Sequence, residues 1–172
     1  ECSDEVFGGY PWFHREEMIH SDGFPWSGSL SLRESVLRAG VREKLRVADY
    51  VNARYHESCA ALPALAEEGA RDAKLRRIQG LCFQYFMANL QERASAMCGL
   101  SGMSVLTPYC DDRLVQYLYN VPWPMKSMRG HEKGLLRAAM EGVVSDELLW
   151  RKKSPFPKTY HPEYAQKIVG QL

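Results

Sequence analysis

The residues with the clearest chemical potential lie in the opening segment, residues 1–10. Glu1, Asp4 and Glu5 place three carboxylates within five positions, ahead of an apolar pair and a double glycine. Such a cluster can hold a divalent cation and leave one carboxylate free for proton transfer. The pattern is also typical of a helix beginning near Val6, because Asp4 and Glu5 favour its positive end. From the local sequence alone, this second, structural interpretation is favoured.

A second set of candidate residues lies in the basic segment 129–137, Arg-Gly-His-Glu-Lys-Gly-Leu-Leu-Arg. Lys133 and Arg137 are four residues apart, so we expect them on one face of a helix beside a glycine-containing turn. Two cations in this arrangement can meet phosphate oxygens, although a solvated basic face is the commoner meaning of the spacing. A third basic segment, 151–156, adds Lys153 in a proline-broken loop, and by itself it predicts a surface patch.

The elements that must position these residues are predicted to be helices. One long amphipathic helix is expected to face the core with its apolar residues, and a second helix follows after a polar connection. Shorter helices are expected after a cap at Asp111 or Asp112, over 133–140, after Ser145 and from Pro162. No period-two pattern indicates a strand, so the chain is predicted to be mostly α. The apolar stripes are Leu30, Leu37, Val41, Leu45, Ala48, Val51 and Tyr55 in the first helix, and Leu75, Ile78, Cys82, Tyr85 and Phe86 in the second.

The amino-acid composition limits which classes of protein this chain can belong to. The 172 residues are 45% hydrophobic and 25% charged, which fits one globular domain. A net charge of +1 gives no general reason to expect binding to nucleic acid or to a membrane surface. No apolar run approaches the roughly 20 residues that span a bilayer. The five scattered cysteines lack metal-binding spacing and predict reduced thiols in a cytoplasmic protein.

The order of the motifs is more specific than any one of them. The acid cluster is followed by Pro-Tyr-Cys-Asp at 108–111, then by Lys-Gly-Leu-Leu-Arg at 133–137, and then by Arg-x-Lys-x-x-Phe at 151–156. This order resembles the C-terminal part of the synthetase domain of glutamine-hydrolysing asparagine synthetases. The resemblance runs from Glu1 to about Tyr164, and its specific parts are 1–13 and 108–164.

The resemblance implies a fold and a site. Residues 1–172 would be the helical C-terminal portion of an α/β domain of the ATP-pyrophosphatase type. The pyrophosphate-loop half and an N-terminal glutaminase domain would lie upstream in a longer parent, so the fragment alone would be inactive. Glu1 would assist the ammonia nucleophile, Asp4 would bind Mg²⁺, and Lys133 would stabilise charge on the departing pyrophosphate. Arg137 and Lys153 would bind substrate or nucleotide.

The resemblance also implies the reaction and its partners. ATP would adenylate the side-chain carboxylate of aspartate, and ammonia derived from glutamine would displace AMP to give asparagine. The parent could form a homodimer. Related ligases that close β-lactam rings tend to have a tyrosine where Glu1 stands, so Glu1 favours the asparagine-forming branch.

Two alternatives remain open at this point. The family usually has Glu-x-Arg-x-Pro where this chain has Ser104-Val105-Leu106-Thr107-Pro108, and an Asp-Arg pair is replaced by Ser95-Ala96. These changes permit a related adenylating amidotransferase that acts on another carboxylate. They also permit a degenerate, non-catalytic paralogue that serves as an interaction module.

Overall fold

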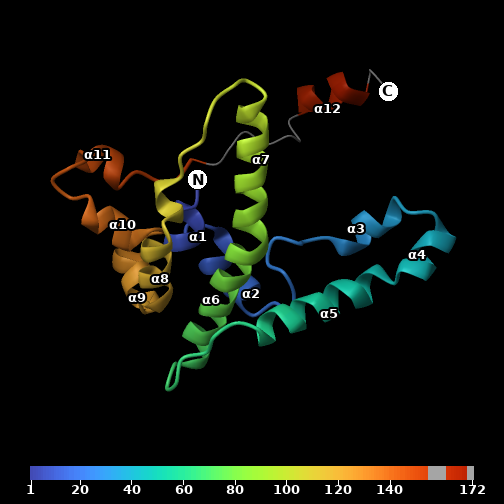
Figure 1. Cartoon of the computed structure of the whole chain (residues 1–172), viewed down its shortest axis with the longest axis horizontal. Coiled ribbons are helices and arrows are strands. Elements are labelled where there is room, and N and C mark those ends of the chain that lie inside the picture. Colours follow the sequence, from blue (N-terminus) through green and yellow to red (C-terminus); the bar gives the residue numbers. More distant parts are fainter. Residues whose placement is uncertain (155–161, 170–172) are drawn as a thin grey trace. The chain divides into compact units, whose positions relative to one another are not determined.

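A computed structural model describes residues 1–154 and 162–169 (Figure 1). The chain divides into two compact units, Glu1–Ala139 and Met140–Leu172. The described residues are mostly helical and contain no β-strand, which confirms the predicted mostly α character. None of their helices is long and apolar enough to cross a membrane. Pro155 and Phe156, at the end of the third basic segment, lie outside the described residues.

The first unit is built along one continuous helical run in three parts. Helix α6 (Ala70–Leu81) passes into a π-helical segment, Cys82–Met87, and then into α7 (Ala88–Gly99) (Figure 1). The predicted apolar face is confirmed in its first half, where Leu75, Ile78 and Cys82 are buried. Tyr85 is 42% exposed, because the π-helical turns shift the register of the side chains after Cys82.

The buried face of α6 packs against the N-terminal segment, which carries the acid cluster and the residues that follow it. This segment comprises α1 (Ser3–Phe7), the 3₁₀ turn Pro11–Phe13 and α2 (Glu16–Ile19). Trp12 is buried in the same cluster, with Trp26 packed against it, so both anchor this stretch to the core. The buried residues of the cluster are Trp12, Phe13, Ile19, Leu75, Ile78, Cys82 and Trp123.

A second cluster packs α1 against α8 (Asp112–Asn120) and comprises Cys2, Val6, Phe7, Leu118 and Val121. The predicted cap of α8 is confirmed, since Asp111 accepts a hydrogen bond from the backbone N–H of Arg113 at 2.9 Å. Helix α9 (Trp123–Lys126), a 3₁₀ turn at Met128–Gly130 and α10 (Gly134–Ala139) then return the chain to α1. The basic segment is thereby carried to the acid cluster.

The expected single helix over the first apolar stripe is wrong. The chain forms α3 (Leu30–Ser35), α4 (Ala39–Leu45) and α5 (Val47–Ala60) instead. Arg46 adopts a left-handed conformation (φ 45°), which ends α4 and turns the chain into α5. The stripe does not face the core of this unit along its length: Tyr55 is buried, whereas Val41 and Leu45 are exposed.

The second unit contains α11 (Asp146–Leu149) and α12 (Pro162–Val169). Both match predicted helices, and Pro162 stands at the first position of its helix as expected. Ser145 occupies the N-cap position of α11 with extended backbone angles, although its side chain makes no capping hydrogen bond in the described part of the chain. Leu149 is buried.

Candidate active site

The three carboxylates of the acid cluster occupy different positions at the start of α1. Glu1 is exposed before the helix, Asp4 is half-buried, and Glu5 is buried at 1% exposure. Asp4 and Glu5 lie in the first turn of α1, where the helix N-terminus favours negative charge. The structural interpretation is confirmed in that both carboxylates lie at a helix N-terminus, although the helix begins at Ser3 and not near Val6. The three carboxylates have different surroundings, and hence different chemical capacities.

Asp4 is paired with the lysine that the sequence analysis selected. The Lys133 ammonium nitrogen lies 3.1 Å from Asp4 Oδ1, and both side chains are about one-fifth to one-quarter exposed (21% and 24%). A pair with this burial is less screened than a surface pair and still accessible to a ligand. The structure thus brings together the predicted metal ligand and the predicted catalytic cation, from opposite ends of the first unit's sequence.

The backbone around this ion pair is held in an uncommon conformation. Lys133 has φ 55° and Cys2 has φ 72°, both in the left-handed region that non-glycine residues rarely occupy. Such residues cluster at functional sites because the surrounding structure must hold them there. Because Lys133 precedes α10, which begins at Gly134, the prediction that it shares a helical face with Arg137 is wrong.

Two glycines permit the close packing of this site. A Cβ atom on Gly9 would overlap the Asp4 carboxylate, and one on Gly134 would overlap the backbone of Met128. Gly9 also donates its backbone N–H to the Asp4 carbonyl oxygen at 2.7 Å, which closes the turn after α1. Gly9 is therefore required by the position of the Asp4 carboxylate, and Gly134 by the approach of the Met128 backbone to the start of α10.

Arg137 and Lys153 occupy different settings. The Arg137 side chain is 11% exposed; its Nε donates to the Glu132 carbonyl oxygen at 2.8 Å and a terminal nitrogen lies 3.1 Å from Glu132 Oε1. Glu132, within the basic segment, was not anticipated as its partner. Lys153 is exposed and belongs to the second unit. The phosphate-binding roles of both residues remain predictions.

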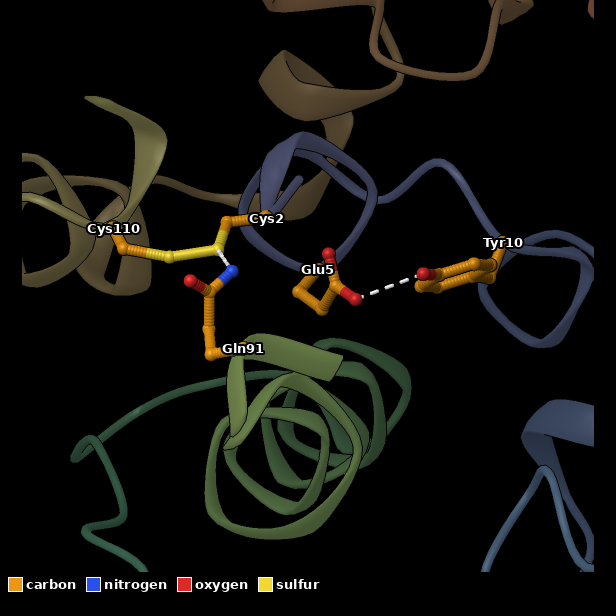
Figure 2. The surroundings of a disulfide bond; sticks show 5 residues. All are labelled: Cys2, Glu5, Tyr10, Gln91 and Cys110. Carbon is orange, nitrogen blue, oxygen red and sulfur yellow. Dashed lines mark hydrogen bonds between the residues drawn. A yellow bond between two sulfur atoms is a disulfide. The ribbon is translucent and has the colours of Figure 1, made fainter. Parts of the chain in front are cut away.

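Glu5, the third carboxylate of the cluster, is buried. The Tyr10 hydroxyl donates to Glu5 Oε1 at 2.8 Å, whereas Oε2 is buried without a hydrogen-bond partner among the described residues (Figure 2). Desolvation by burial raises the pKa of Glu5, and the neighbouring charges of Asp4 and Glu1 act in the same direction. Glu5 is suited to holding α1 in place rather than to exchanging protons with solvent.

The cysteine prediction is wrong for one pair. Cys2 and Cys110 form a disulfide with a Cα–Cα distance of 5.9 Å (Figure 2), and the Gln91 side chain donates to Cys2 Sγ at 2.9 Å. Sequence spacing could not predict the pair because the packing of α1 against α8 brings the two positions together. Cys59, Cys82 and Cys98 are free thiols, as predicted.

The acid cluster does not form a cage of carboxylates for a metal ion. Within residues 1–154 and 162–169, no three His, Cys, Asp or Glu side chains are grouped to hold one. Mg²⁺ is commonly bound through one or two carboxylates together with substrate phosphates and water. Asp4, a half-buried carboxylate beside a cation, fits that partial donor set, whereas Glu5 is turned toward Tyr10.

Gln79 and Lys126 are among the buried polar residues that the sequence pattern did not predict. Gln79 is fully buried and Lys126 is 2% exposed. Gln79 carried a signal, because it lies four residues after Leu75 and three before Cys82 on the apolar face of α6. Lys126 carried none, since a lysine after Trp-Pro-Met is indistinguishable from a surface residue.

The motifs and the Asp4–Lys133 pair define a member of a known enzyme family. The chain belongs to the asparagine synthase family, whose sequence profile matches residues 1–172. It is 44% identical, over all 172 residues, to "Asparagine synthetase [glutamine-hydrolyzing] 3" of Bacillus subtilis (strain 168). The alignment covers 100% of this chain and 28% of that relative, so the chain spans less than a third of the relative's length.

Proposed function

We propose that this chain is the C-terminal part of the synthetase domain of an ATP-dependent, amide-forming ligase. In the parent protein, a side-chain carboxylate oxygen of aspartate attacks the α-phosphorus of ATP, giving β-aspartyl-AMP and pyrophosphate. Ammonia from glutamine then attacks the acyl carbon and AMP leaves, giving asparagine. The observation that carries the proposal is the Asp4–Lys133 pair in a chain of the asparagine synthase family.

Asp4 would supply one carboxylate oxygen to Mg²⁺ beside the phosphates. The metal, when bound, neutralises negative charge on the phosphate oxygens. Lys133 Nζ lies 3.1 Å from that carboxylate, so an anion held at Asp4 would be within reach of the ammonium group. A cation placed where charge develops stabilises the transition state of transfer at phosphorus. Lys133 has left-handed backbone angles (φ 55°), and its ammonium group lies beside Asp4 of α1.

Glu1 would act in the second half-reaction. When ammonia adds to the acyl carbon, its nitrogen becomes positively charged and must lose a proton before AMP can leave. Glu1 is an exposed carboxylate immediately before the turn that carries Asp4, so it can accept that proton. Glu5, although closer to Asp4 in sequence, is buried against Tyr10 and takes no part in the transfer.

Arg137 and Lys153 are proposed to contact substrate or nucleotide. The bonds from Arg137 to Glu132 fix the guanidinium on α10, within the segment that carries Lys133. A preorganised guanidinium loses little side-chain entropy on meeting an anion. For Lys153, an exposed residue of the second unit, this role rests on the resemblance alone.

ATP–pyrophosphate exchange by the full-length parent protein, with Mg²⁺ and with or without aspartate, tests the proposal. We expect exchange that depends on aspartate and falls at least a hundredfold in Lys133→Met, because the charge-stabilising cation is lost (about 2.7 kcal/mol or more). Glu1→Gln should retain exchange but form little asparagine. The exposed Lys44→Met variant is the matched control and should behave as the wild type.

Other outcomes of this experiment contradict the proposal in separate ways. Exchange that depends on a different acid in a panel of carboxylates would retain the ligase class and replace aspartate, in line with the changes at Ser104 and Leu106. If none of the carboxylates in the panel supports exchange, the parent protein is a degenerate, non-catalytic paralogue. Turnover of ATP by the isolated chain would contradict the assignment of the pyrophosphate loop to an upstream half.

A further inference from the structure

Two buried polar side chains connect α1 to the rest of the first unit. Lys126 Nζ donates to Gln79 Oε1 at 2.6 Å, and Gln79 Nε2 donates to the carbonyl oxygens of Val6 at 2.8 Å and Glu5 at 3.3 Å. Gln79 belongs to α6 and Lys126 ends α9. The chain of hydrogen bonds therefore joins three elements that are far apart in sequence.

The carbonyl groups that Gln79 binds need a partner. Helix α1 has five residues, and the last four carbonyl groups of a helix have no partner within it. Glu5 and Val6 are themselves buried, so an unpaired carbonyl oxygen at these positions would be costly. The Gln79 amide, fully buried on the facing helix, supplies the N–H donors that water supplies at an exposed helix end.

Lys126 determines which way the Gln79 amide faces. An amide group can present either its oxygen or its NH₂ to a given neighbour. In its ammonium form Lys126 can only donate, so it takes the amide oxygen, and the NH₂ group is left for the carbonyl oxygens of α1. A buried lysine is a costly residue, and hydrophobic packing alone would be served as well by methionine. Its location is explained by this orienting contact.

We propose, on the basis of the proposed function of Asp4 and Glu1, that Gln79 and Lys126 are positioning residues for α1, the helix that carries Asp4. They touch neither substrate nor metal. They fix the end of α1, and through it they fix Asp4, which is one position before Glu5 and faces Lys133. A displacement of about 1 Å at reacting groups can cost a hundredfold in rate, so the position of this short helix matters for catalysis.

The decisive variant is Gln79→Glu in the full-length parent protein. The glutamate keeps the shape of the side chain and gives Lys126 a stronger acceptor, but its second oxygen faces the carbonyl oxygens of Glu5 and Val6. We expect the affinity for ATP with Mg²⁺ to weaken about tenfold in a calorimetric titration, and kcat to fall about a hundredfold. The affinity for ATP without Mg²⁺ should stay the same. The matched control is Gln84→Glu, an exposed glutamine in the same helical run.

The second variant is Lys126→Met, which removes the orienting donor without leaving a buried charge. It should reproduce the loss of Mg²⁺-dependent ATP affinity, and in the double variant Gln79→Glu/Lys126→Met the two losses should not add, since both act on α1. Lys44→Met is its control. A lowered melting temperature with unchanged kcat and ATP affinity in either folded variant would show a purely structural role and overturn the inference.

An Asp4→Asn variant separates this inference from the proposed function. If Asp4→Asn abolishes Mg²⁺-dependent ATP binding while Gln79→Glu and Lys126→Met do not weaken it, the proposed function stands and the positioning role is wrong. If Asp4→Asn leaves that binding unchanged, the metal role of Asp4 fails and the positioning inference fails with it.

Discussion

At the scale of single residues, environment decides the chemistry of three carboxylates that the sequence presents together. Glu1 is exposed, Asp4 is paired with Lys133, and Glu5 is buried against Tyr10. The order of the motifs, through the family resemblance that it carries, selected Asp4 and Lys133 as candidates. No sequence pattern predicts the left-handed backbone conformation of Lys133.

Gly9→Ala tests how closely Asp4 is held. The added Cβ atom would overlap the Asp4 carboxylate, so the carboxylate must move away from Lys133. We expect Mg²⁺-dependent ATP affinity to fall about tenfold, by the same sensitivity to small displacements. Isothermal titration calorimetry measures this affinity.

Gly28→Ala is the control, because a Cβ atom there meets nothing within 4 Å. Unchanged affinity in Gly9→Ala would mean that the Asp4 position seen here is not the one that binds the metal.

At the scale of elements, the packing of α1 against α8 and α10 assembles the candidate site. The Cys2–Cys110 disulfide joins α1 to the 3₁₀ turn Pro108–Cys110 that precedes α8. Its cysteines are 108 positions apart in sequence, so it closes a long loop of the unfolded chain. Long loops are those in which a cross-link removes the most chain entropy.

Cys110→Ser should therefore destabilise the protein. Loop-closure entropy suggests about 5 kcal/mol at this separation. Urea unfolding measures the loss, and Cys98→Ser, at a free half-buried thiol, is the control. A thiol titration of the denatured, unreduced protein should find two fewer thiols than after reduction. Equal counts before and after reduction would contradict the disulfide.

At the scale of the whole molecule, the polar interior of the first unit links stability to pH. Burial, reinforced by the charge of Arg76, lowers the pKa of Lys126 to about 7, whereas Glu68 and Asp72 oppose the shift. Between pH 7 and the usual lysine pKa, the unfolded chain binds more protons at this residue than the folded chain does. The free energy of unfolding should therefore rise with pH above 7.

We expect a rise of about 2 kcal/mol between pH 7 and 8.5, at a limit of roughly 1.4 kcal/mol per pH unit. Below pH 8.5 the buried Cys82 thiol, whose pKa is raised by burial, contributes little. Urea titrations at several pH values measure the slope. Lys126→Met should flatten it, Lys44→Met should not, and a slope that survives in Lys126→Met would assign it to another group.

The sequence by itself determined the helical class, the family resemblance and the main catalytic candidates. Apolar periodicity locates α6 and its buried residues, and the order of short motifs identifies the family, because both are local properties of the chain. The same locality explains the errors. Apolar spacing alone did not show the left-handed turn at Arg46 that separates α4 from α5.

Only the tertiary structure decided which distant residues meet. The Asp4–Lys133 ion pair, the Cys2–Cys110 disulfide and the hydrogen bonds from Lys126 through Gln79 to α1 all join positions that no spacing rule relates. Each depends on how the helices of the first unit pack, which is set by many small apolar contacts acting together. The sequence gives the types of the side chains, whereas the distances between them are set by the folded chain.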